Sequence, residues 1–123
     1  NSQFSEDIRY LSKVDDELLS ALYSACEVFC FPSIDEGFGV PIIEAQICNA
    51  LVITSDKEPM REVAGEAAIL VDPYDTESIA GAFSSYSEKA ELIKSKNAKN
   101  IEGFSKEMLT KNYLYEYRGL IAK

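Results

Sequence analysis

The chain has 123 residues, which is enough for one domain. Of these residues 46% are hydrophobic and 11% aromatic, so the chain can form a packed core. This composition argues against an intrinsically disordered chain. The net charge of −9 disfavours nucleic acid or an anionic membrane surface as a partner. No segment resembles a signal peptide, and no apolar run is long enough to span a bilayer.

The residue counts also limit the chemistry. The chain has no His, so acid–base work falls to carboxylates, Tyr, Lys or backbone groups. Its three cysteines form no CxxC pair, which indicates reduced thiols. The reduced thiols lead us to expect a cytoplasmic protein. As a separate expectation, the full-length form is peripheral to the inner membrane.

Short apolar segments alternate with amphipathic ones along the chain. Strands are predicted at 8–14, 27–33, 51–56 and 67–73, and helices at 15–26, 40–50, 59–65, 76–93 and 105–120. The polar stretch 94–100 is expected to be a solvated helix end or loop. Buried strands that alternate with helices predict an α/β fold, with a Rossmann-like parallel sheet of about four strands and helices on both faces. The chain does not begin with Met, and we expect residues 1–123 to be a single partial domain of a longer protein.

The segment FPSIDEGFGVPIIEAQ, residues 31–46, follows the second predicted strand and leads into a helix. Ligands of parallel α/β sheets bind beyond the carboxyl ends of the strands, where this loop is placed. Gly37 and Gly39 allow a close approach of the backbone, and the first N–H groups of the helix have no partners within it. A diphosphate would fit at that helix end, whereas Glu36 suits an uncharged sugar ring. An ordinary tight turn is the alternative interpretation.

Glu44 lies on the same predicted helix. A helical projection from Val40 places it on an apolar face with Ile43, Ile47 and Cys48, and places Ile42 and Gln46 on the opposite side. A glutamate in an apolar stripe must find hydrogen-bond donors. It would either accept hydrogen bonds from ligand hydroxyls, such as those of ribose, or form a structural ion pair or capping contact.

At this point the sequence resembles a known family. The segment FPSIDEGFGVPIIEA is similar to the E-x7-E signature of the retaining glycosyltransferases of family 4, which have the GT-B fold. The resemblance continues through LVITSD, EPMREVAGEAAILVDP and DTESIAGAF, and upstream through VDDELLSALYSACEVFCFPS, so it covers roughly residues 8–85. It implies that the chain is the later half of a C-terminal, donor-binding domain.

The resemblance also implies roles for single residues. Glu44 takes the position that binds the ribose hydroxyls of a nucleotide-sugar, and Glu36 the position of a catalytic carboxylate beside the transferred sugar. Gly37, Phe38 and Gly39 take positions that supply backbone amides near the sugar and the diphosphate, and Val40 is counted with the donor-binding residues. Where the family has Gly, a small residue and Pro, this chain has the segment 49–51, Asn-Ala-Leu.

The resemblance further implies a transfer of sugar to a glycan or lipid acceptor in polysaccharide biosynthesis, with an N-terminal domain that holds the acceptor. The donor is of the UDP or GDP type, no cofactor or metal is expected, and the isolated chain is expected to be inactive. Two alternatives are a non-catalytic flavodoxin-like or receiver-like binding module, and a fragment that self-associates through its exposed surfaces.

Overall fold

A computed structural model of the chain describes residues 4–104. Its centre is a parallel sheet of three strands in the order β1-β2-β3, which are β1 (Phe29–Phe31), β2 (Val52–Ser55) and β3 (Ala68–Val71). In the register, Phe29 pairs with Val52 and Val52 pairs with Ala68. The predicted α/β class with a parallel sheet is confirmed, although the described residues form three strands rather than four.

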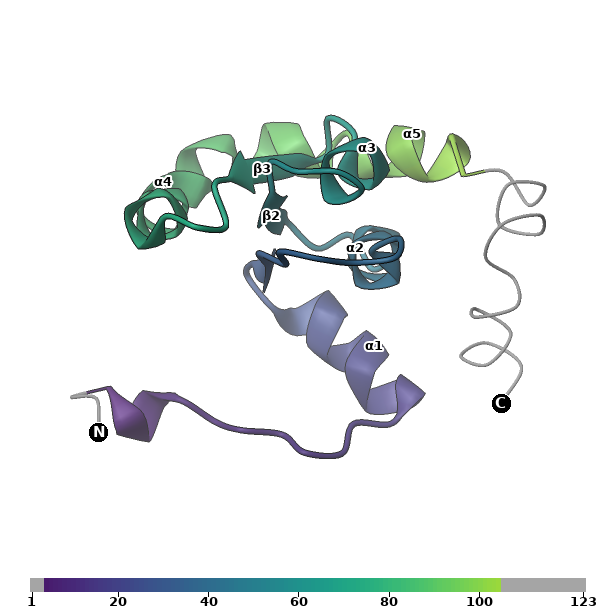
Figure 1. Cartoon of the computed structure of the whole chain (residues 1–123). Helices are drawn as coiled ribbons and strands as arrows, with labels where there is room; N and C mark the ends of the chain where they lie inside the picture. Colours follow the sequence, from purple (N-terminus) through teal and green to yellow (C-terminus); the bar gives the residue numbers. More distant parts are fainter. Residues whose placement is uncertain (1–3, 105–123) are drawn as a thin grey trace.

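Helices cover both faces of this sheet (Figure 1). The covering helices are α1 (Asp16–Ala25), α2 (Val40–Ile47), α3 (Met60–Ala64), α4 (Thr76–Lys94) and α5 (Asn97–Glu102). The short helix η1 (Ser5–Asp7) lies near the N-terminus, away from the sheet (Figure 1). Helices α1, α2 and α3 pack on the face that carries Phe29 and Val52, and α5 packs against α2. Helix α4 covers the face that carries Ile53 and Val71. Because neighbouring residues of a strand point to opposite faces, β2 is buried on both sides.

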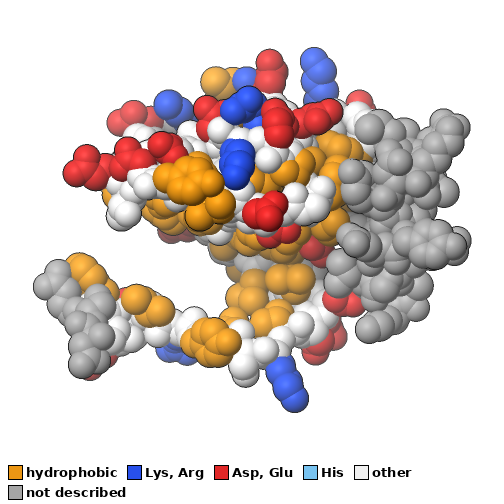
Figure 2. Space-filling view, in the orientation of Figure 1, with side chains coloured by type: hydrophobic (Ala, Val, Ile, Leu, Met, Phe, Trp, Pro, Cys, Tyr) orange, Lys and Arg blue, Asp and Glu red, His pale blue; other side chains and the backbone are white. Residues whose placement is uncertain are grey.

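The strand predicted at 8–14 is wrong. This segment contains no strand, and Figures 1 and 2 show it extending away from the body of the molecule with its hydrophobic side chains uncovered. Tyr10 is 90% exposed and Ile8 is 67% exposed. A β-strand needs a neighbour for its hydrogen bonds, and residues 4–104 offer none beside this segment.

Helix α5 was not predicted, because its sequence is polar. Asn97 is 2% exposed, and its Nδ2 donates to the carbonyl oxygen of Ala50 at 3.0 Å. Asn100 Nδ2 donates to Gln46 Oε1 at 2.6 Å and to the carbonyl oxygen of Val63 at 2.9 Å. Amide side chains therefore attach α5 to α2 and α3, where apolar contacts would otherwise be expected. The helix predicted at 105–120 lies outside the described residues.

The turn between α2 and β2 shows how the chain adapts to a missing glycine. Asn49 takes the left-handed conformation, with a φ of 58°. In the family that the sequence resembles, this position is usually Gly. Asn tolerates this region better than most residues. Its side chain also accepts a hydrogen bond from Asn97 Nδ2 at 3.0 Å. The substitution thus keeps the turn and adds a link to α5.

No helix within residues 4–104 combines the length and apolarity that crossing a membrane requires.

Candidate functional site

Three loops meet at the carboxyl edge of the sheet. They are residues 32–39 after β1, residues 56–59 after β2 and residues 72–75 after β3. Since the strands are parallel and adjacent, their carboxyl ends lie at one edge, and the loops become neighbours. The first of them carries Glu36 and leads into α2, which carries Glu44. The structure therefore places the loop with Glu36 and the start of α2 at the edge where sheets of this class bind ligands.

Glu36 is held by its own loop. Ser33 Oγ donates to Glu36 Oε1 at 3.2 Å, and the Glu36 side chain is partly buried. Gly37, the next residue, is exposed, and a Cβ added to it would meet nothing within 4 Å. The space in front of Gly37 is therefore open, as the approach of a ligand to its backbone would require.

Helix α2 begins without a side-chain cap. Its N-cap is Gly39, which has a φ of 96°, and a Cβ at this position would lie 3.2 Å from Ile42 Cδ1. Pro41 stands in the first turn, and no acidic residue does. The positive end of the helix dipole is thus neither capped by a side chain nor neutralised by a carboxylate in that turn, which suits an anion.

Phe38 and Val40 flank Gly39. The Phe38 ring packs edge-to-face on Phe104, with the centroids 6.0 Å apart, and belongs to the periphery of the main core. Its side chain therefore contributes to packing. Val40, the first residue of α2, is partly buried.

Glu44 lies in the second turn of α2 and is partly buried. Its pKa is raised above the usual value of 4.5, first by loss of solvation and then by repulsion from Asp16 on α1. Within residues 4–104 no group donates a hydrogen bond to its carboxylate, and both ion pairs belong to Arg61. The structural ion pair considered as an alternative is therefore absent from the described part of the chain.

The helical projection of α2 was only partly right. Ile43 is buried as predicted, but Ile47 on the same predicted face is 53% exposed. Ile42 and Gln46, which the projection placed opposite, are fully buried. The reason is that α1, α3, α5 and the sheet all contact α2, so that its buried surface extends well beyond one stripe.

The end of β2 contributes residues that the sequence did not single out. Side chains of Thr54, Ser55 and Lys57, called here the β2 anchor, each donate to a backbone carbonyl oxygen of the segment that precedes Glu36. A polar run directly after a buried strand, TSDK, was the available signal. Without knowledge of the strand order, its partner could not be assigned.

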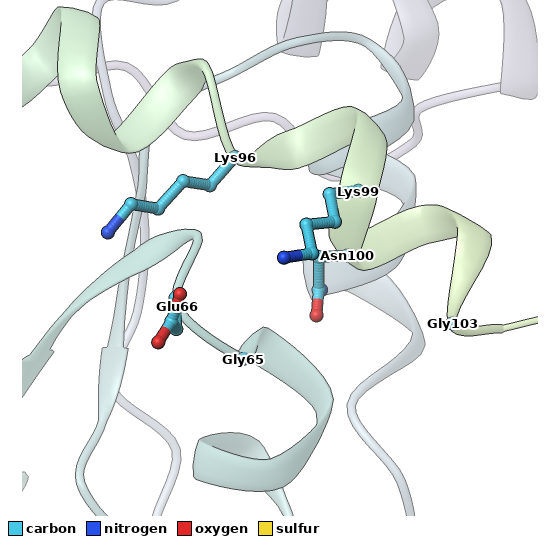
Figure 3. A pocket seen from close by; sticks show the side chains of 6 residues that line it. All are labelled: Gly65, Glu66, Lys96, Lys99, Asn100 and Gly103. Atoms are coloured by element: carbon cyan, nitrogen blue, oxygen red, sulfur yellow. The ribbon is translucent and has the colours of Figure 1, made fainter.

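A separate hollow lies at the opposite edge of the sheet. It has a volume of about 350 Å³ and lies between α5 and the turn that leads into β3 (Figure 3). Its lining residues are Gly65, Glu66, Lys96, Lys99, Asn100 and Gly103. Because Gly65 and Glu66 precede β3, this hollow is remote from Glu36. In the described part of the chain, no group of three or more His, Cys, Asp or Glu side chains is placed to hold a metal ion.

The family profile described as "Glycosyl transferases group 1" matches residues 1–103. The chain belongs to this family. The resemblance noted in the sequence is thereby confirmed, and a flavodoxin-like or receiver-like binding module is not favoured.

Individual relatives agree with the group 1 assignment. The chain is 45% identical over 73 residues to O-antigen chain mannosyltransferase B of Escherichia coli, covering 59% of this chain and 19% of the relative. It is 35% identical over 91 residues to O-antigen chain mannosyltransferase RfbU of Salmonella typhimurium, covering 74% of this chain and 26% of the relative. This chain thus spans about a fifth to a quarter of the length of these relatives.

A solved structure supports the fold. The chain superposes on sucrose-phosphate synthase from Thermosynechococcus elongatus with a TM-score of 0.76 and 26% identity, over 96% of this chain and 31% of that one. The architecture described above is therefore that of part of a GT-B glycosyltransferase.

Proposed function

We propose that this chain carries the nucleotide-sugar-binding part of a retaining glycosyltransferase, whose full-length form transfers a sugar to a glycan or lipid acceptor. The observation that carries the proposal is Glu44, a partly buried carboxylate with a raised pKa and no hydrogen-bond donor within residues 4–104. A buried polar group without a partner is costly, and a ligand that brings two hydroxyl groups would remove that cost. In this proposal Glu44 accepts hydrogen bonds from the ribose.

The start of α2 and Glu36 bind the other parts of the donor in this proposal. The uncapped start of α2, with the backbone amides of Gly37, Phe38, Gly39 and Val40, faces the sugar and the diphosphate. Glu36 contacts the transferred sugar as the catalytic carboxylate. Cleavage at the anomeric carbon needs a stabilised diphosphate leaving group and a fixed sugar, and these groups serve both needs.

Several relatives are mannosyltransferases, which makes mannose the first sugar to test. UDP and GDP remain the candidate nucleotides, and the reaction in this proposal requires no metal or other cofactor. Residues 1–123 form one partial domain, and the acceptor is held by a part of the full-length protein outside this chain. Transfer by this chain alone is therefore not expected.

Calorimetric titration with nucleoside diphosphates and their 2′,3′-dideoxy analogues tests the role of Glu44. Glu44→Gln keeps the size of the side chain but removes the charged acceptor. We expect it to weaken binding of the ribose form about tenfold or more, since hydrogen bonds to charged groups contribute about 1.5–3 kcal/mol. The dideoxy analogue should bind the wild type and the variant equally.

Glu88→Gln on the exposed side of α4 is the matched control, because it removes the same charge from another helix. An equal loss for the ribose and dideoxy forms in Glu44→Gln would contradict a ribose contact. No binding by the wild-type chain at millimolar nucleotide would overturn the proposal.

A further inference from the structure

The loop that carries Glu36 is held at several points by the β2 anchor. Thr54 Oγ1 donates to the carbonyl oxygen of Phe31 at 2.8 Å, and Ser55 Oγ donates to that of Ser33 at 2.6 Å. Lys57 Nζ donates to the carbonyl oxygen of Ile34, two residues before Glu36, at 2.6 Å. In the described part of the chain, no backbone hydrogen bond is donated by residues 32–37 to other loops or turns. The loop therefore depends on side chains for its position.

Lys57 also reaches the third loop at this edge. Its Nζ donates to the hydroxyl oxygen of Tyr74 at 3.2 Å and lies 5.6 Å from the centre of the Tyr74 ring. A Lys ammonium group has three donors and no acceptor, so it can bind oxygens on two loops at once. Within residues 4–104 Lys57 takes part in no ion pair, because both ion pairs are made by Arg61.

The position of Ile34 bears directly on Glu36. Ser33 is fixed through its carbonyl oxygen by Ser55, and its hydroxyl group donates to Glu36 Oε1. Lys57 fixes the following residue, Ile34. The Ser33 hydroxyl group lies 3.2 Å both from Glu36 Oε1 and from the carbonyl oxygen of Asp35, so it can donate to either of them. Release of Ile34 would thus loosen the segment between Ser33 and Gly37, and Glu36 with it.

We propose that Lys57 is a positioning residue for Glu36, because it joins the loops that follow β1 and β3 and fixes the segment that holds this carboxylate. The inference rests on the proposed function, in which Glu36 contacts the transferred sugar. Lys57 suits a test better than its neighbours, since Thr54 and Ser55 are fully buried whereas Lys57 is only partly so.

The first measurement uses the ligand-free chain. NMR order parameters of the backbone at residues 34–37 are compared in the wild type, Lys57→Met and Lys57→Arg. We expect order parameters of about 0.85 in the wild type and below about 0.6 in Lys57→Met, with recovery in Lys57→Arg, which keeps hydrogen-bond donors at this position. Lys89→Met on the exposed side of α4 is the matched control and should behave as the wild type. Unchanged order in Lys57→Met would overturn the inference.

The second measurement uses UDP and GDP with and without an attached sugar. In Lys57→Met the extra affinity that the sugar adds to the nucleotide should fall about tenfold, whereas affinity for the bare nucleotide stays the same. An equal loss for both ligands would overturn the positioning role, because it would indicate general damage to the site. If the wild type binds neither ligand, the proposed function fails, and the order parameters alone then decide the inference.

Discussion

Glu44 is the residue at which the stability of the chain and its proposed activity oppose one another. Burial and the nearby Asp16 both raise its pKa, so folding favours the protonated carboxyl. The stability that this group contributes is fully present below the pKa of the unfolded chain, near 4.5, and is lost as the pH rises through the higher pKa of the folded chain. At neutral pH the charged form is therefore a burden on the fold, and a ribose ligand would relieve it.

This opposition gives a prediction for Glu44→Gln. At pH 7 the variant should unfold at a higher urea concentration than the wild type, because it removes an ionised, partly desolvated group. Below about pH 4 the difference should vanish, since Glu44 is then protonated in both the folded and unfolded wild type. Urea unfolding at the two pH values measures this, with Glu88→Gln as the control for loss of a charge. A variant that is less stable than the wild type at pH 7 would contradict the argument.

Asn49 allows a second prediction on a single residue. Asn49→Ala should destabilise the fold by about 2 kcal/mol. Alanine has a Cβ that is strained in the left-handed region and no polar side chain to compensate, and it removes the acceptor for Asn97. Asn49→Gly removes the same acceptor but accommodates a φ of 58° without strain, so it should retain about 1 kcal/mol more stability than Asn49→Ala. Urea unfolding of the two variants measures the difference. Equal losses would show that backbone strain has no role in this turn.

Among the elements, those with local signals were predictable from the sequence and those that depend on distant partners were not. Helix α1 was predicted from its periodicity and from the acidic residues in its first turn. In the structure Asp15 caps this helix by accepting from the N–H of Leu18 at 2.8 Å. The segment 8–14 has a strand-like pattern but no neighbouring strand within residues 4–104. Helix α5 was missed because its contacts join amides far apart in the sequence.

The amide contacts that attach α5 to α2 and α3 give a prediction for Asn100. Asn100→Ala should destabilise the chain by about 1–3 kcal/mol, since it leaves the buried Gln46 Oε1 and the carbonyl oxygen of Val63 without their donor. Alanine itself favours a helix, so a loss of stability would not come from helix propensity. The free energy of unfolding in urea is the measurement. Lys99→Ala, on the same helix but exposed, is the control and should change stability little.

For the molecule as a whole, the sheet brings together groups that lie far apart in the sequence. The E-x7-E spacing of Glu36 and Glu44 could be found in the sequence, because the two residues lie close together along the chain, one in the loop before α2 and one in α2 itself. The β2 anchor could not be found in this way, because Lys57 contacts that loop, and Thr54 the last residue of β1, only through the parallel order of β1 and β2. The same reasoning applies to Tyr74, which meets Lys57 only because β3 lies beside β2.

The central claim, that this chain carries a nucleotide-sugar site at the carboxyl edge of its sheet, is tested most directly by NMR titration of the chain with UDP, GDP and their sugar-linked forms. We predict that one nucleotide shifts the amide signals of residues 33–44 and that Glu44→Gln weakens this response, whereas Glu88→Gln does not. Shifts confined to the hollow between α5 and the turn before β3, or a response that Glu44→Gln leaves unchanged, would contradict the claim.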